Sequence, residues 1–205
     1  MNFIKRNMKS FKNFVFVVIA VAFLSAAAPV ENTYILSKNY TVTINGTSNL
    51  HNWNEKVETV SGSSVVGSNS DGSFDLTAVN IKMNVHSIKS DMGSVMDNNT
   101  YKALKADANP EIIFTLTAPV KSIQTKASEP TVSAKGNLTI AGVTKPVNMQ
   151  VKVYMQEHGK LAFEGSQAIK MTDYGINPPT ALFGTMKTGN EITINFVTNF
   201  TTAIN

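Results

Sequence analysis

The chain has no cysteine among its 205 residues, and only three histidines and one tryptophan. The absence of thiols excludes disulfides, thiolate catalysis and cysteine-based zinc or iron–sulfur centres. The histidines, His51, His86 and His158, lack the close spacing of a metal-binding motif. A domain without cross-links must rely on its hydrophobic core, and a chain of this length can bury a sufficient one. We therefore predict no metal site and no cofactor.

Recognisable catalytic motifs are missing as well. The sequence contains neither a Gly-x-Ser-x-Gly nucleophile elbow nor a glycine-rich phosphate loop. Its carboxylates are scattered, and no spacing marks two of them as an acid–base pair. These absences predict a protein that is not an enzyme. An enzyme acting on a lipid or its oxidised head group, with His51, His86 or Asp173 in its site, is kept as an alternative.

The first residues have the layout of an export signal. Four basic residues and no acidic ones stand near the start: Lys5, Arg6, Lys9 and Lys12. An unbroken apolar run over 14–24 follows, and then small residues over 25–28. This order is typical of a secretory signal peptide, and the run is too short for the ~20 apolar residues of a membrane-spanning helix. We predict a signal peptide over 1–28 and a periplasmic or otherwise secreted domain over 29–205. A membrane anchor that stays attached is the alternative.

Removal of the predicted signal peptide changes the charge balance. The whole chain has 18 Lys and Arg against 14 Asp and Glu, but the remainder carries 14 of each. Nucleic-acid binding needs a basic surface, and attraction to anionic lipid head groups needs basic clusters. We therefore expect no nucleic-acid partner and no stable membrane insertion of the mature protein.

Alternation of apolar and polar residues dominates the mature chain and predicts β-strands. The clearest alternating runs cover 79–86, 147–153 and 192–196, and a shorter one begins at Val42. Turn signals separate these runs and predict tight turns over 70–73, 157–160 and 188–190, a longer connection over 141–146 and a polar loop over 121–130. Proline cannot donate to a strand ladder, so Pro146 is expected at a strand start.

One segment breaks the alternation and predicts a short helix over 94–106. Ser94 and Asp97 have the spacing of a capping box. Three apolar side chains of this segment could share one helix face: Met96, Tyr101 and Leu104. Pro110 follows and pushes Asn109 out of the helical region, which ends the helix.

The order of elements predicts an all-β fold. Eight or nine short strands, linked by turns and interrupted by a single helix, favour an antiparallel up-and-down arrangement over parallel βαβ units. A sheet of about eight strands closes into a barrel wide enough for side chains or for one slender ligand. A β-sandwich is the competing architecture, because alternation is the same in both.

Three segments resemble the YceI family of bacterial periplasmic proteins. Residues 136–147 (GNLTIAGVTKPV) are similar to the family signature Gly-x-Leu-Thr-Ile-x-Gly-Val-Thr-Lys-Pro-Val. Residues 96–114 resemble the family's helix followed by a Pro-x-Ile-x-Phe strand, and residues 171–176 (MTDYGI) resemble its Arg-x-Asp-Phe-Gly-Ile segment. With residues 46–53 (GTSNLHNW), which fit a subgroup, the resemblance spans residues 33–198.

The resemblance implies a lipocalin-like, elongated antiparallel barrel in the periplasm. Members that carry ligands hold a polyisoprenoid chain, such as a quinone-type tail, along the barrel axis. The resemblance also allows a homodimer, and it brings no catalytic residues. Two positions depart from the family pattern: residues 98–101 (NNTY) replace a common Arg-Asp-x-His-Leu run, and the late arginine is replaced near Lys170. These departures affect the identity of the ligand rather than the fold.

Binding of an isoprenoid tail needs a long dry slot, because the tail has no hydrogen-bonding group. Methionines adapt to an irregular chain, and aromatic rings add apolar surface. The candidate ligand-contacting residues are Trp53, Phe74, Met83, Met96, Tyr101, Leu104, Phe114, Met149, Tyr174 and Phe183. Packing in a closed core is the alternative role for each of them. We expect Trp53 at a barrel end or in the pocket wall, and residues 177–184 at the barrel mouth.

Three hypotheses follow from the sequence. The leading one is an exported protein that binds an isoprenoid or a similar long apolar amphiphile inside the barrel. The second is a stress-related or interaction protein whose barrel is solid and holds no ligand. The third is the enzyme described above.

Overall fold

The computed structural model describes residues 31–124 and 130–203. The predicted signal peptide, and residues 125–129 of the predicted polar loop, lie outside the described residues. None of the helices found within the described ranges has the length and apolar character needed to cross a bilayer.

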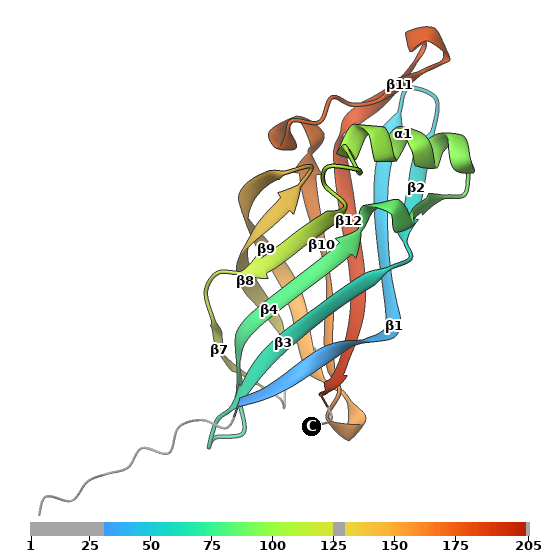
Figure 1. Ribbon diagram of the computed structural model, residues 1–205. Helices are drawn as coiled ribbons and strands as arrows, with labels where there is room; N and C mark the ends of the chain where they lie inside the picture. Colours follow the sequence, from blue (N-terminus) through green and yellow to red (C-terminus); the bar gives the residue numbers. More distant parts are fainter. Residues whose placement is uncertain (1–30, 125–129, 204–205) are drawn as a thin grey trace, which may run out of the picture.

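Eight antiparallel strands form a closed barrel (Figure 1). They are β1 (Glu31–Ser48), β3 (Val60–Ser68), β4 (Phe74–Asn84), β6 (Glu111–Leu116), β8 (Thr131–Ile140), β9 (Val143–Met155), β10 (Leu161–Lys170) and β12 (Met186–Thr202). Each pairs with the next in this order, and β12 returns to β1 along most of its length, from Tyr34↔Thr202 to Ser48↔Thr188. This closing pair confirms the predicted up-and-down barrel and excludes the sandwich.

Further elements decorate the barrel, mainly at one end (Figure 1). They are β2 (Asn52–Val57), β5 (Ile88–Ser90), β7 (Val120–Ile123), β11 (Thr180–Ala181), the helix α1 (Ser94–Leu104), and the 3₁₀ turns η1 (Val85–Ser87), η2 (Glu157–Gly159), η3 (Met171–Tyr174) and η4 (Leu182–Gly184). β2 pairs with β1, β5 with β2, β7 with β4 and β11 with β12. The pairing of β7 shows that the start of the predicted polar loop is a short strand.

The predicted alternation places apolar side chains inside the barrel. In β9, Met149, Val151 and Val153 are buried, whereas Asn148 and Gln150 between them are exposed. The same alternation holds in β4 from residue 79 onward. Each inward residue removes apolar surface from water, which contributes about 25 cal/mol for every Å² buried. The interior of the barrel is therefore the core of the protein.

Two of the predicted turns are confirmed and one is wrong. Residues 70–73 link β3 to β4, where the Asp71 carboxylate accepts hydrogen bonds from the backbone and hydroxyl of Ser73. Residues 157–160 link β9 to β10. In contrast, residues 188–190 lie inside β12. Gly189 is needed there for close strand approach, because a Cβ on it would lie 2.4 Å from Thr47 Oγ1.

The connection predicted over 141–146 is also shorter than expected. Only Ala141 and Gly142 separate β8 from β9, both with positive φ (49° and 81°), as in the tight primed turns of hairpins. Pro146 therefore lies within β9 instead of at its start. It pairs with Asn137 of β8, and β10 covers β9 only from Val151 onward, so the missing N–H breaks no ladder on that side.

The predicted helix is confirmed, but its ends differ from the prediction. Gly93 is the N-cap and Ser94 is the first helical residue, so the expected capping box is wrong. The helix ends at Leu104 because Lys105 adopts a left-handed conformation (φ 52°), with its N–H bonded to the carbonyl of Lys102. α1 lies across one end of the barrel in Figure 1.

Candidate functional site

Two apolar chambers follow one another through the barrel interior. The helix-side chamber lies between α1 and the barrel end and has a cavity volume of about 100 Å³. The barrel chamber has a cavity volume of about 90 Å³. Ile194 of β12 lines both chambers, so they are neighbours along the barrel.

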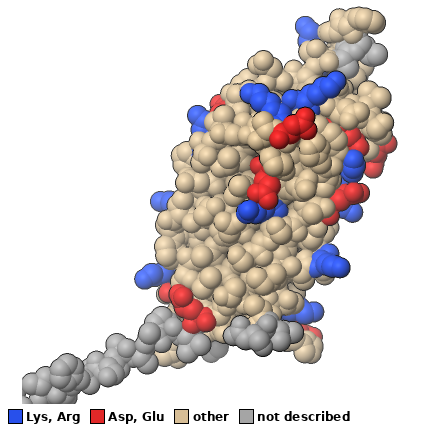
Figure 2. Space-filling view, in the orientation of Figure 1, with Lys and Arg blue, Asp and Glu red and all other residues tan. Residues whose placement is uncertain are grey.

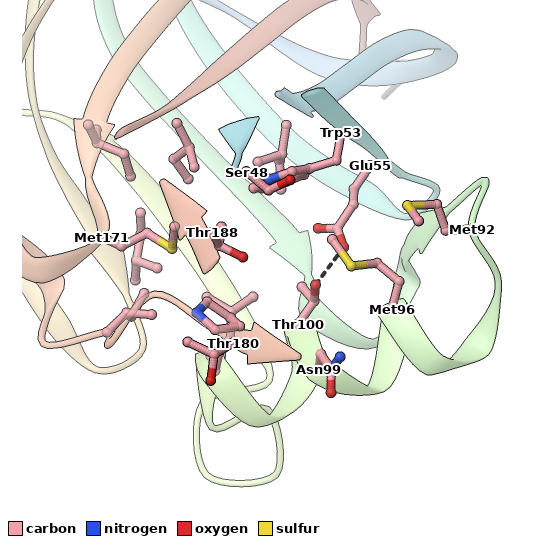
Figure 3. Close-up of a pocket in the computed structure, with 18 of the residues that line it drawn as sticks. Ser48, Trp53, Glu55, Met92, Met96, Asn99, Thr100, Met171, Thr180 and Thr188 are labelled. Carbon is pink, nitrogen blue, oxygen red and sulfur yellow. Dashed lines mark hydrogen bonds between the residues drawn. The ribbon is translucent and has the colours of Figure 1, made fainter. Parts of the chain in front are cut away.

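The helix-side chamber is walled by strand residues of the barrel and by one face of α1 (Figure 3). The apolar wall contains six isoleucines of barrel strands: Ile44, Ile112, Ile140, Ile169, Ile192 and Ile194. From α1 come Met96 and the residues three, four, seven and eight positions after it: Asn99, Thr100, Ala103 and Leu104. This spacing is that of one helix face, so the helix forms a lid with a partly apolar inner surface.

The barrel chamber is lined almost entirely by apolar residues of the closed barrel. They include Leu76, Val79, Met83, Phe114, Leu138, Met149, Val151 and Phe163. Phe114 packs over Gly136, where an added Cβ would lie 2.2 Å from the ring. Glycine at this position lets the Phe114 ring pack directly against the backbone of β8.

Trp53 forms part of the wall of the helix-side chamber, as expected from the sequence. Its ring covers Gly46 of β1, where a Cβ would lie 2.2 Å from Trp53 Cζ2. The indole Nε1 donates a hydrogen bond of 3.0 Å to the carbonyl of Thr47. The polar atom of the side chain is therefore satisfied by the backbone, and the ring is fixed at the chamber wall.

Glu55 is the unexpected residue of the helix-side chamber. It belongs to the inward-facing series of β2 and is only 2% exposed. One carboxylate oxygen, Oε1, accepts a hydrogen bond from the hydroxyl of Thr100 on α1 (Figure 3). Burial raises the pKa of Glu55, the negative charge of Asp97 raises it further, and the Thr100 hydrogen bond opposes this increase.

A polar cluster on the other side of α1 anchors the helix. Asp97 accepts hydrogen bonds from the backbone N–H of Ser90 (2.8 Å) and from Lys89 Nζ (3.2 Å). The Ser90 bond, and to a lesser extent Lys89, lower the pKa of Asp97. Tyr101 accepts a bond of 2.7 Å from Lys89 Nζ, and its hydroxyl lies 2.8 Å from the carbonyl of His86. These contacts hold α1 to β5 and η1, and so fix the position of the lid.

Six of the ten candidate residues line a chamber. Trp53, Met96 and Leu104 line the helix-side chamber, and Met83, Phe114 and Met149 line the barrel chamber.

The other four candidates line neither chamber: Phe74, Tyr101, Tyr174 and Phe183. Phe74 and Tyr174 are buried in the surrounding core, and Phe183 is fully exposed at η4. Tyr101 belongs to the anchoring cluster, because it lies on a different face of α1 from Met96. The sequence predicts residues 177–184 at the barrel mouth. Two of them, Pro179 and Thr180, line the helix-side chamber.

Sequence reasoning missed Glu55, Asn99 and Thr100. A signal for Glu55 was present, because it alternates with Asn54 and Lys56 in the same phase as Trp53. A glutamate in the apolar phase of a strand is a buried-carboxylate candidate. For Asn99 and Thr100, the helical spacing from Met96 was the available signal.

The residues named for the alternative enzyme do not come together. His51 lines the helix-side chamber, whereas His86 is an outer residue 3.7 Å from the Asp107 carboxylate. Asp173 is exposed in η3 and lines neither chamber. No group of metal-ligating side chains was found within residues 31–124 and 130–203.

The three sequence segments that resemble the YceI family meet at the helix end of the barrel. Gly142, in the β8–β9 turn, accommodates Asn109, since a Cβ would lie 2.8 Å from Asn109 Oδ1. Gly175, after η3, lies beside Val143, with 3.8 Å between its ideal Cβ position and Val143 Cγ2. The similarities therefore describe one connected structural feature rather than separate fragments.

The outer surface shows no large area of one charge sign on the visible face. In Figure 2, basic and acidic side chains are interspersed, often next to one another. Examples of opposite charges in contact are Lys82 with Glu111 (3.2 Å) and Lys152 with Glu164 (3.6 Å). This distribution agrees with the balanced charge of residues 29–205.

Comparison with known proteins agrees with this architecture. A family model described as YceI-like domain matches residues 32–200. A UPF0312 protein of Pseudomonas aeruginosa is 31% identical over 113 residues, which are 52% of this chain and 59% of that protein. A UPF0312 protein of Pseudomonas paraeruginosa is 38% identical over 65 residues, which are 29% of this chain and 34% of that protein. The chain thus spans less than two thirds of the length of these relatives.

Solved structures share the fold at low sequence identity. A polyisoprenoid binding domain from Saccharophagus degradans is 12% identical, with a TM-score of 0.63 over 84% of this chain and 99% of that chain. BcnA of Burkholderia cenocepacia is 20% identical, with a TM-score of 0.57 over 79% of this chain and 96% of that chain. Because the family model covers most of the described chain, the protein belongs to the YceI-like domain family.

Proposed function

We propose that this protein is an exported carrier that holds a long apolar lipid of the isoprenoid type along the axis of its barrel. The observation that carries the proposal is the pair of neighbouring apolar chambers, which meet at Ile194. An extended hydrocarbon chain is the ligand shape that matches such a passage, because it needs apolar walls and no convergent polar groups.

The energetics of burial support a chain of several isoprene units. Each buried CH₂ contributes about 0.8 kcal/mol, so one five-carbon unit contributes roughly 3 kcal/mol before the cost of ordering the chain. Methionines on the walls, such as Met83, Met96, Met149 and Met171, can adapt to methyl branches. The polyisoprenoid binding domain with the same fold supports this choice of ligand class.

The two alternatives have less support. A solid barrel would have inward side chains that meet across the centre, whereas here Gly136 allows the Phe114 ring to lie against the wall. An enzyme would need reactive groups beside a chamber, and of the three named residues only His51 lies there. We therefore propose a binding protein without catalytic activity.

Export is the second part of the proposal. It depends on the basic, apolar and small-residue segments over 1–28. If the full chain is produced in a Gram-negative bacterium, N-terminal sequencing of the periplasmic fraction should find a start near residue 29. A protein that stays uncleaved in the membrane fraction would contradict export as a free domain.

Ligand extraction tests the carrier function. The mature protein should be purified from its native host without detergent, extracted with organic solvent, and the extract analysed by mass spectrometry. A stoichiometric amount of a polyprenyl lipid is the expected result. The lipid-free protein should then rebind it, and Trp53 fluorescence can report the binding, because Trp53 is the single tryptophan and lines the helix-side chamber. Failure to extract or rebind any apolar chain would contradict the proposal.

A further inference from the structure

A buried carboxylate stands in the wall of the helix-side chamber. Glu55 is 2% exposed, and Oε1 is held by the Thr100 hydroxyl. Within the described part of the chain, no further hydrogen bond or ion pair reaches its other oxygen, Oε2. Oε2 therefore has free capacity to bond a polar group that enters the chamber, and a carboxyl with so little exposure gains from such a partner.

The surroundings of Glu55 offer no positive charge to neutralise it. None of the described residues that line the helix-side chamber is a lysine or an arginine. The nearest acidic neighbour, Asp97, is already paired with Lys89 on the other side of α1. His51 is the one basic side chain of this wall, and it is exposed. Burial without a counter-ion raises the pKa of Glu55, so an anion placed beside it meets either the negative charge of the carboxylate or the cost of keeping it protonated. An uncharged head group meets neither cost and can hydrogen-bond the carboxyl in either form.

A second polar side chain of α1 also lines this chamber. Asn99 precedes Thr100 on the inner face of α1 and lines the same chamber (Figure 3). Among the described residues, the side-chain amide of Asn99 makes no hydrogen bond. Asn99, Thr100 and Glu55 thus gather polar groups at the helix end of the passage.

We propose that Glu55, with Asn99 and Thr100, is the subsite for the polar head group of the bound lipid, and that it selects an uncharged hydroxyl or carbonyl head group over an anionic one. This inference rests on the proposed carrier function. The tail then extends past Ile194 into the barrel chamber. A phosphate or carboxylate head group is rejected, because it would be brought beside a buried acid and near Asp97 with no cation in the wall.

The test compares lipids that share one tail and differ in the head group. Geranylgeraniol, geranylgeranyl phosphate and geranylgeranylamine should be titrated into the lipid-free mature protein at pH 7.5, with Trp53 fluorescence as the signal. We expect the alcohol to bind at least about tenfold more tightly than the phosphate, since like charges at close range cost well over 1 kcal/mol. Binding of the phosphate as tight as that of the alcohol, or tighter, would overturn the proposal.

Glu55→Gln tests the role of the carboxyl directly. It preserves the shape and a bond to Thr100 but removes the acid, so it should strengthen phosphate binding and reduce the alcohol-to-phosphate ratio about tenfold. Glu58→Gln is the matched control, because Glu58 is exposed just beyond β2 and lines neither chamber. An unchanged ratio in Glu55→Gln would overturn the proposal.

The design separates this inference from the carrier function. If none of the three lipids binds to the wild-type protein, the carrier function itself fails. If all three bind with equal affinity, the carrier function stands and the head-group subsite fails. The wild-type ranking needs no variant, so the proposal stays testable even if Glu55→Gln does not fold.

Discussion

The two chambers of the passage differ mainly in the polar groups of their walls. In the barrel chamber, the polar residues among those described are Gln167 and Thr198, and the side chains of both already donate to backbone carbonyls. The helix-side chamber has seven: Ser48, His51, Glu55, Asn99, Thr100, Thr180 and Thr188. One chamber therefore suits hydrocarbon alone, whereas the other can also receive a polar group.

The difference follows from the elements that build each chamber. The barrel chamber is made of closed-barrel strands, whose alternation directs apolar side chains inward. The helix-side chamber adds α1, β2 and η3, which lie outside the eight-stranded ring. The barrel thus provides a slot for any apolar chain, and the added elements determine what stands at its opening.

The largest expected effect on stability lies at the far end of the barrel from α1. Phe200 is fully buried and meets Phe163 edge to face, with 5.2 Å between the ring centroids. Phe200→Ala should lower the free energy of unfolding by about 3–5 kcal/mol, whereas Met96→Ala at the half-buried lid should lower it by less than about 2 kcal/mol. Urea denaturation of both variants measures the difference. Equal losses would mean that the lid is packed as tightly as the barrel.

Blocking the barrel chamber should affect long lipids more than short ones. Ala134 lines this chamber, so Ala134→Trp places an indole in the path of the tail. Displacement of one isoprene unit costs roughly 3 kcal/mol, or about a hundredfold in Kd. Native mass spectrometry should show this loss for solanesol and a smaller loss for geranylgeraniol. Lys135→Trp, on the exposed side of the same strand, is the control. Equal losses for both lipids would contradict a tail in this chamber.

Loosening the lid should change its dynamics without unfolding the barrel. Asp97→Asn weakens the bonds to Ser90 and Lys89 that hold α1. A hydrogen bond to a charged group contributes about 1.5–3 kcal/mol when buried, and a part-exposed one less, so amide exchange in α1 should accelerate about five- to thirtyfold. Hydrogen exchange measures this. Exposed Asp91→Asn should have no such effect, and uniform acceleration in the barrel strands would contradict a local role.

The two buried acids near the lid should have opposite effects on the pH dependence of stability. The folded-state pKa of Glu55 is raised by burial, so its protonated form is favoured in the fold. The contribution of Glu55 to the free energy of unfolding is therefore present at low pH. It is lost as the pH rises from about 4.3, the ordinary pKa of glutamate, through the raised pKa of the folded state. The pKa of Asp97 is lowered, so its contribution is lost as the pH falls. Glu55→Gln should remove the first slope, which urea denaturation across pH can detect. A slope unchanged in this variant would show that Glu55 is ionised at little cost.

Much of the barrel could be predicted from the sequence, because alternation in strands such as β4 and β9 fixes which residues face inward. Closure was expected from the number of strands and the family resemblance, but alternation alone could not show it. β1 and β12 stand at opposite ends of the described chain, and local patterns carry no information on pairing at that distance. The sequence predicts a turn at Gly189, because glycine occurs both in turns and where two strands approach closely. Only the contact with Thr47 in the structure shows that the second reason applies here.

The site was less predictable than the fold. Met83, Phe114 and Met149 could be chosen because large apolar residues in the inward phase line any barrel. Whether such residues fill the centre or leave a passage depends on packing between strands, such as Phe114 on Gly136. The polar end of the passage depends on where α1 lies, and helix spacing alone does not show which face meets the barrel.

The most direct test of the account is a high-resolution crystal structure of the mature protein purified from its native host. We predict continuous elongated density that begins beside Glu55, passes Ile194 and ends between Phe114 and Met149. A barrel whose inward side chains meet across the centre, with no space for a single hydrocarbon chain, would contradict the account.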